Sequence, residues 1–168
     1  GATIPMIISR ARPDVRGARY APGMTAPTDA VLTWLLDGDA AVRNAVHRDL
    51  LHDPSPEREA AVPSDGDAAR ILAARRPDGH WGEAFYRPKW ISTHYTLLEL
   101  RGLGVPSTHE ACRASVATVL TLPRVTGGVV SRPDMAPDVC VNGMILTYAC
   151  HFGAPEASLT SIIDFVLG

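Results

Sequence analysis

The sequence lacks the features of a membrane or nucleic-acid protein. Its uninterrupted apolar stretches are only a few residues long, which is too short to span a bilayer. Its formal net charge is only −2, and the basic residues are scattered, so we expect no nucleic-acid partner. The first residues also lack the order of charged region, apolar core and small-residue cleavage site that marks a signal peptide.

Cysteine is also scarce. There are three, Cys112, Cys140 and Cys150, an odd number in a chain long enough to fold around a core without disulfides. Such cysteines are typical of a reducing compartment, where they serve as small apolar residues or as ligands. We therefore expect a cytoplasmic protein.

Period-2 alternation of apolar and polar residues is nearly absent, which counts against strands. Residues 1–28 contain four prolines and three glycines and are predicted to form an extended arm. From residue 29 onward, apolar residues follow helical spacing between cap residues and Gly or Pro stops. The sequence therefore predicts an all-α domain over residues 29–168.

Helix caps place several of these boundaries. Asp39 and Asp138 each precede an apolar-periodic run and are predicted N-caps, and Asp65 or Asp67 is expected to open another helix. Ser107, with Glu110 three residues later, has the pattern of a capping box.

One block of the sequence occurs twice. RRPDGHWG at 75–82 is followed about 47 residues later by PRVTGGVV at 123–130. After each come an apolar helix, a Gly-Xaa-Pro turn and a second amphipathic helix. Two helices per unit of this length predict helical-hairpin repeats, in which each hairpin leaves an apolar face for a neighbour to cover. This uncovered face favours a homo-oligomer.

The string Arg75-Arg76-Pro77-Asp78-Gly79-His80-Trp81-Gly82 resembles a family motif. Squalene and hopene cyclases repeat Gln-x-x-x-Gly-x-Trp, and protein prenyltransferase β subunits carry turns of the type Gln-x-Pro-Asp-Gly-Gly-Trp. Here Arg75 replaces the glutamine. Residues 65–167 thus resemble the (α/α) toroid of these enzymes, with Asp-Gly as a tight turn and Trp81 as an anchor.

Two departures from that family limit what the resemblance implies. A complete toroid has five to seven hairpins, and this chain has room for about three, so we expect an incomplete toroid. The Asp-x-Asp-Asp acid motif of the cyclases is missing, and only 6% of the residues are aromatic. Both observations count against polyene cyclisation.

The prenyltransferases bind zinc through an Asp-x-Cys and a distant histidine, and Asp138-Val139-Cys140 has that pattern. Carboxylate and thiolate are ligands that zinc accepts, so the resemblance implies an incomplete zinc site. The alternative is that Asp138 is a helix cap and Cys140 a buried apolar residue. His47 and His52 are five apart, whereas a spacing of four places two histidines on one α-helical face, so we do not expect a metal there.

A second candidate site precedes the helix of the first block. In the toroids, the corresponding loops line the mouth of the central cavity. The resemblance implies that aromatic side chains there bind a hydrophobic ligand and that His94, with Asp78, supplies acid or base chemistry. The alternative is that the tryptophans pack between hairpins and His94 is a turn residue. The candidate ligand-binding residues are Trp81, Tyr86, Trp90 and Tyr95.

These observations leave two functions open. The first is a terpenoid-cyclase- or prenyltransferase-like domain that binds a hydrophobic, isoprenoid-type small molecule, with or without catalysis. The second is a non-catalytic helical-repeat scaffold that binds protein or lipid. Fold resemblance does not decide between them, because fold and function are separable.

Overall fold

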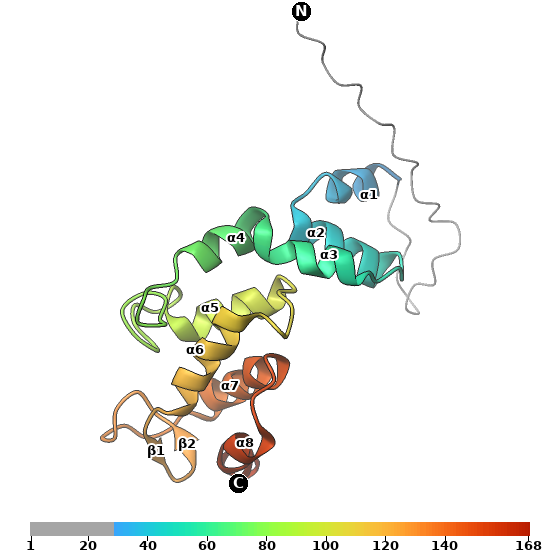
Figure 1. The fold of residues 1–168 in the computed structure, drawn as a ribbon. Coiled ribbons are helices and arrows are strands. Elements are labelled where there is room, and N and C mark those ends of the chain that lie inside the picture. The colour runs from blue at the N-terminus through green and yellow to red at the C-terminus, as the bar shows by residue number, and fades with distance from the viewer. Residues whose placement is uncertain (1–28) are drawn as a thin grey trace, which may run out of the picture.

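The computed structural model describes residues 29–168, and that part of the chain is mostly helical (Figure 1). The prediction of an all-α fold is therefore confirmed for these residues, apart from one two-stranded hairpin. In chain order the elements are α1 (Asp29–Leu36), α2 (Ala40–Ala45), the π-helical turn η2 (Val46–Leu50), α3 (Pro56–Ala61), the 3₁₀ turn η3 (Val62–Ser64), α4 (Gly66–Ala73), α5 (Thr93–Gly102), α6 (Glu110–Leu120), β1 (Arg124–Val125), β2 (Gly128–Val129), α7 (Val139–His151) and α8 (Glu156–Leu167).

Two expectations concern the ends and the environment of the chain. The extended arm predicted over residues 1–28 lies outside the described residues. Between residues 29 and 168, none of the helices has the length and apolar character needed to cross a lipid bilayer.

Two aspartates join the N-terminal ends of α2 and α4. Asp39 is the N-cap of α2, where its Oδ1 accepts a hydrogen bond from the Val42 amide at 3.0 Å. Its Oδ2 accepts from the Asp67 amide of α4 at 3.2 Å. Asp65 in turn accepts from the Ala40 amide of α2 at 3.0 Å. Each helix thus satisfies an amide at the start of the other, which orients the two helices relative to each other.

Asp39→Ala is expected to lower the free energy of unfolding by about 1–2 kcal/mol, because both helix starts lose an acceptor. The two amides, first that of Val42 and then that of Asp67, lower the pKa of Asp39, so the carboxylate is the form that the fold stabilises. Urea denaturation at neutral pH measures the loss. Asp37→Ala, an exposed aspartate beside the same turn, is the matched control and should change stability by less than about 0.5 kcal/mol. Equal losses in the two variants would refute the role of Asp39.

The C-terminal half consists of two helical hairpins, α5 with α6 and α7 with α8, which Figure 1 shows next to each other. Helix α5 packs on α7, and the side chains between the hairpins are fully buried. The starts of the helices repeat at equal spacing, since α5 and α7 begin at 93 and 139, and α6 and α8 at 110 and 156. The largest buried side chains of these helices include Leu97, Leu100, Ile145, Tyr148 and Ile162.

The predicted Gly-Xaa-Pro turns end α5 and α7 in the same way. Gly104 and Gly153 have φ values of 80° and 72°, in the left-handed region that glycine adopts without a Cβ penalty. The amide after each glycine donates to the carbonyl five residues earlier, from Val105 to Leu100 and from Ala154 to Ala149. This is the Schellman motif, and it turns the chain from the first helix of each hairpin into the second.

The two similar loops are also attached to their hairpins in the same way. Arg75 Nε donates to Ser115 Oγ on α6 at 2.9 Å, and this hydroxyl donates to the Gly79 carbonyl at 2.7 Å. In the second block, Arg124 Nη1 donates to Ser161 Oγ on α8 at 3.1 Å and to the Gly127 carbonyl at 3.5 Å. An arginine therefore joins a serine of the second helix to a loop glycine in both hairpins.

A buried asparagine holds the β-hairpin on α7. Asn142 has an exposed fraction of 0%, and its Oδ1 accepts from the Val129 amide at 2.7 Å. Its Nδ2 donates to the carbonyls of Val129 and Asp138 at 3.1 and 3.0 Å. The amide side chain thus pairs the edge of the hairpin and the helix start without leaving its own polar atoms unsatisfied.

Candidate functional site

An aromatic cluster surrounds the N-terminal end of α5. His94 lies at its centre, with ring centroids of Phe85 and Tyr86 at 5.3 Å, Tyr95 at 5.0 Å and Tyr148 at 5.7 Å. These spacings are in the range of favourable aromatic pairs. Three of the four predicted ligand-binding residues, all but Trp81, belong to this cluster or contact it.

His94 itself is sealed inside the cluster, with an exposed fraction of 0%. Its Nδ1 lies 3.3 Å from the Tyr148 hydroxyl, and its Nε2 has no hydrogen-bond partner among residues 29–168. Burial lowers the pKa of His94 to about 4, so the imidazole is neutral near pH 7. The predicted acid–base residue therefore lies beneath the aromatic surface and not on it.

The outer layer of the cluster consists of Tyr86, Trp90 and Tyr95, which we call the aromatic face. Their ring centroids are 5.4 Å apart for Tyr86 and Tyr95 and 4.9 Å apart for Trp90 and Tyr95. The two tyrosine hydroxyls are hydrogen-bonded at 2.7 Å. Trp90 is 67% exposed, and the following Ile91 is 64% exposed, whereas the tyrosines are half-buried. The aromatic face therefore presents apolar area to solvent.

Trp81 and Asp78 lie elsewhere. Trp81 is 3% exposed, and its Nε1 donates to the Ile71 carbonyl at the end of α4 at 2.7 Å. Asp78 is exposed in the turn, where its Oδ1 accepts from the His80 amide at 3.0 Å. Gly79 has φ 87°, as the predicted Asp-Gly turn requires. Trp81 is an anchor between loop and helix, and Asp78 is separate from His94.

The second predicted candidate, Asp138 with Cys140, lies at the start of α7. Asp138 is the N-cap, and its Oδ1 accepts from the Val141 amide at 3.0 Å. Cys140 is exposed, which differs from the expectation of a buried apolar cysteine. Within residues 29–168, no three His, Cys, Asp or Glu side chains gather as a metal would need. The structure thus shows the capping role of Asp138, and Cys140 and Asp138 have no third ligand beside them in the described part.

These two residues nevertheless belong to the surroundings of the aromatic face. The hydrogen bond to Tyr95 contributes most to raising the pKa of Tyr86 to about 12, followed by burial and by repulsion from the ionised forms of Tyr95, Asp138 and Cys140. The start of α7 is therefore close enough to act electrostatically on Tyr86. Val139, between Asp138 and Cys140, is 54% exposed.

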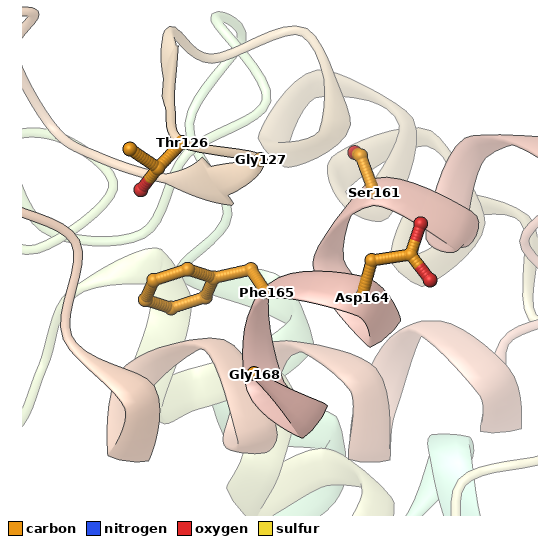
Figure 2. Close-up of a pocket in the computed structure, with 6 residues that line it drawn as sticks. All are labelled: Thr126, Gly127, Ser161, Asp164, Phe165 and Gly168. Carbon is orange, nitrogen blue, oxygen red and sulfur yellow. The ribbon is translucent and has the colours of Figure 1, made fainter.

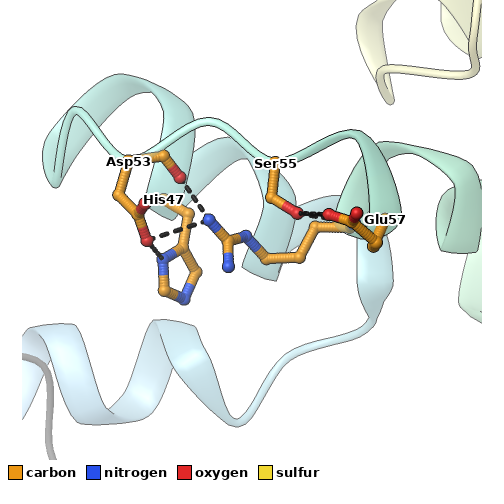
Figure 3. Close-up of polar contacts among 5 residues, drawn as sticks. His47, Asp53, Ser55 and Glu57 are labelled. Carbon is orange, nitrogen blue, oxygen red and sulfur yellow. Dashed lines mark hydrogen bonds and ion pairs between the residues drawn. The ribbon is translucent and has the colours of Figure 1, made fainter.

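A separate polar cluster contains His47, for which no metal role was expected (Figure 3). His47 Nδ1 and Arg58 Nη2 lie 3.2 and 2.9 Å from Asp53 Oδ2. Ser55 Oγ donates to Glu57 Oε2 at 2.6 Å and also caps α3. The contact of His47 joins η2 to the loop that follows it, and the contacts of Arg58 and Glu57 join that loop to α3.

A shallow hollow of about 550 Å³ lies between the β-hairpin turn and α8 (Figure 2). A Cβ on Gly127 would lie 2.6 Å from the Ser161 carbonyl oxygen, so the turn approaches the helix backbone closely. The hollow is open to solvent, and its lining offers one carboxylate, that of Asp164, and no paired acid and base. It is lined by Thr126, Gly127, Ser161, Asp164, Phe165 and Gly168.

Two buried residues at or near the aromatic cluster, Tyr148 and Ser92, were not expected from the sequence. Tyr148 lies 54 residues after His94, within an apolar helix, and gives no local signal of pairing with a histidine. Ser92 is fully buried, and its Oγ has no hydrogen-bond partner in the described chain. Phe85, in contrast, directly precedes Tyr86, so these two aromatic residues are recognisable as neighbours in the sequence.

Comparisons of the chain with known protein families, with curated proteins and with solved structures found no match.

Proposed function

We propose that this protein binds a hydrophobic small molecule on the aromatic face, which lies at the N-terminal end of α5 and in the loop before it. The observation that carries the proposal is the exposure of Trp90, which contacts Tyr95 and is followed by the exposed Ile91. Large apolar side chains that gather at a soluble surface usually mark a binding site. Tryptophan and tyrosine are the residues that contribute most at such sites.

The backbone at Trp90 supports this proposal. Its φ is 78°, a left-handed conformation that is rare for a bulky residue and costs on the order of 1–3 kcal/mol. Burial does not compensate that cost, because the indole is largely exposed. A strained residue whose side chain stays at the surface is typical of a ligand contact.

The resemblance to terpenoid cyclases and prenyltransferases makes an isoprenoid the first ligand class to test. The proposal stops at binding. His94 is enclosed by the cluster, and Asp78 lies in a separate exposed turn, so the two candidate catalytic groups do not meet at the aromatic face.

Farnesol binding is the direct test. We expect saturable binding by isothermal titration calorimetry, and we expect Trp90→Leu to weaken it about tenfold or more, as for an aromatic contact at the centre of a site. Trp34→Leu is the matched control, because Trp34 is also exposed, at 72%, but lies on α1. Equal affinity in Trp90→Leu and wild type would contradict the proposal.

A non-catalytic scaffold is the second candidate, and the exposure of Trp34 on α1 favours it. That side chain is remote in sequence from the aromatic face and offers a separate apolar contact for a protein partner or a second copy. Light scattering distinguishes the two functions: a scaffold that self-associates shows a mass above one chain, and Trp34→Glu should reduce it to that of a monomer.

A further inference from the structure

We infer that the aromatic face accepts a positively charged, alkylated ammonium group, and that Lys89 occupies this position when no ligand is bound. This inference rests on the proposed function, since it specifies the chemical class of ligand that binds the same face.

The first observation is the position of Lys89. Its Nζ lies 4.9 Å from the centroid of the Trp90 ring. A cation within about 6 Å of an aromatic centroid is attracted by the negative π face, most strongly by that of tryptophan. Both residues are exposed, so the ammonium group lies over the ring although solvent is available to it. The position of Lys89 thus shows that the indole face of Trp90 attracts an ammonium cation.

The second observation is the arrangement of further π faces beside Trp90. The Tyr95 ring is tilted by 44° to the indole, and the Tyr86 ring by 45° to that of Tyr95. Neighbouring rings that are tilted in this way do not cover each other's faces as a parallel stack would. A trimethylammonium group is broad and weakly hydrated, so it can contact more than one such face, as in the aromatic sites that bind choline and methylated lysine.

The third observation is the sign of the surrounding charge. The Asp138 carboxylate at the start of α7 is near enough to contribute to the raised pKa of Tyr86, so its negative charge acts on the aromatic face. The same charge favours a bound cation. His94, directly beneath, is neutral near pH 7 and therefore adds no opposing positive charge.

The side chain of Lys89 should then compete with the ligand. Lys89→Gln removes the internal cation and keeps a side chain of similar length, so this variant is expected to bind a trimethylammonium ligand about two- to fivefold more tightly than wild type. Trp90→Leu should bind it at least about fivefold less tightly. Opposite effects of two adjacent substitutions are not expected from a change in stability, and thermal unfolding of each variant checks that both fold.

The probes are (2-hydroxyethyl)trimethylammonium and its neutral carbon isostere, 3,3-dimethylbutan-1-ol, which share shape and differ in charge. Binding to wild type and to both variants is measured by NMR from the methyl signal of each probe, and the indole N–H signal of Trp90 in wild type, assigned with Trp90→Leu, shows where the probe binds. We expect the cation to bind and the neutral alcohol to bind at least about twofold more weakly. Equal binding of the two probes, or weaker binding of the cation by Lys89→Gln, would overturn the inference.

Farnesol separates this inference from the proposed function. If farnesol binds through Trp90 and the cation does not, the aromatic face is a neutral hydrophobic site and the inference fails alone. If neither farnesol nor the cation binds, both fail. If the cation binds and farnesol does not, the inference stands, and the ligand of the site is a cation and not an isoprenoid alcohol.

Discussion

Replacing Trp81 with alanine is expected to lower the free energy of unfolding by about 3–5 kcal/mol, the range for removing a buried aromatic side chain from a core. Trp81 is 3% exposed and belongs to the core cluster that continues through the hairpins. Its indole N–H donates to the Ile71 carbonyl at 2.7 Å, and the Arg75 guanidinium lies 5.9 Å from its ring. The substitution removes this hydrogen bond and contact and leaves a cavity between α4 and α5.

Chemical denaturation followed by circular dichroism measures this effect. Trp34→Ala is the control, because Trp34 is 72% exposed and should cost less than about 0.5 kcal/mol. The comparison also tests the role of the turn motif. A loss at Trp81 no larger than that at Trp34 would mean that the motif tryptophan does not anchor the loop.

Acidification from pH 6.5 to pH 4 is expected to reduce the free energy of unfolding by about 3 kcal/mol through His94 alone. Burial lowers the pKa of His94 from 6.5 to about 4 in the folded protein. Above pH 6.5, the histidine is neutral in both states and stability is unaffected. Between pH 6.5 and 4, the unfolded chain binds a proton that the folded chain does not, so stability falls. Below pH 4, both states are protonated and this contribution stops changing.

Urea denaturation at a series of pH values tests this prediction. His94→Phe keeps an aromatic ring at the position and removes the titrating group, so its stability should depend much less on pH over the same interval. Burial also lowers the pKa of His109, and the difference between wild type and His94→Phe cancels that contribution. Parallel pH profiles for the two proteins would show that His94 is protonated as readily in the fold as in the unfolded chain.

Where local signals control the structure, the sequence predicted it well. Asp39 and Asp138 cap their helices as expected, because a short acidic side chain in front of an apolar helix reaches its first free amides whatever surrounds it. The Asp-Gly turn and the two Gly-Xaa-Pro turns also form as predicted, since only glycine adopts their positive φ values without strain.

The local prediction was wrong for the start of α6, where a predicted helix cap competes with the turn that ends α5. Ser107 with Glu110 has the pattern of a capping box, yet α6 begins at Glu110 and its N-cap is His109, which makes no side-chain cap. Val105 instead completes the Schellman motif with Leu100, and four residues separate Val105 from Glu110, the first residue of α6. Asp65 is the N-cap residue of α4, as predicted, but its side chain makes no cap hydrogen bond there and accepts from the Ala40 amide of α2 instead.

The candidate site was likewise predictable in part from the sequence. Tyr86, Trp90, His94 and Tyr95 lie within ten positions of one another, so their proximity could be predicted from the sequence. Their exposure could not, because it depends on α7. Packing of α5 against α7 encloses His94 against Tyr148 and leaves Trp90 at the surface.

The sequence by itself determined the helical class, the Asp39 and Asp138 caps and the glycine turns, because each depends on residues that are neighbours in the sequence. Only the tertiary structure decided which polar and aromatic side chains face solvent, that Asp39 and Asp65 accept hydrogen bonds from each other's helices, and that His94 pairs with Tyr148. Burial and long-range electrostatics depend on segments far apart in the chain, and no local pattern encodes the distance between them.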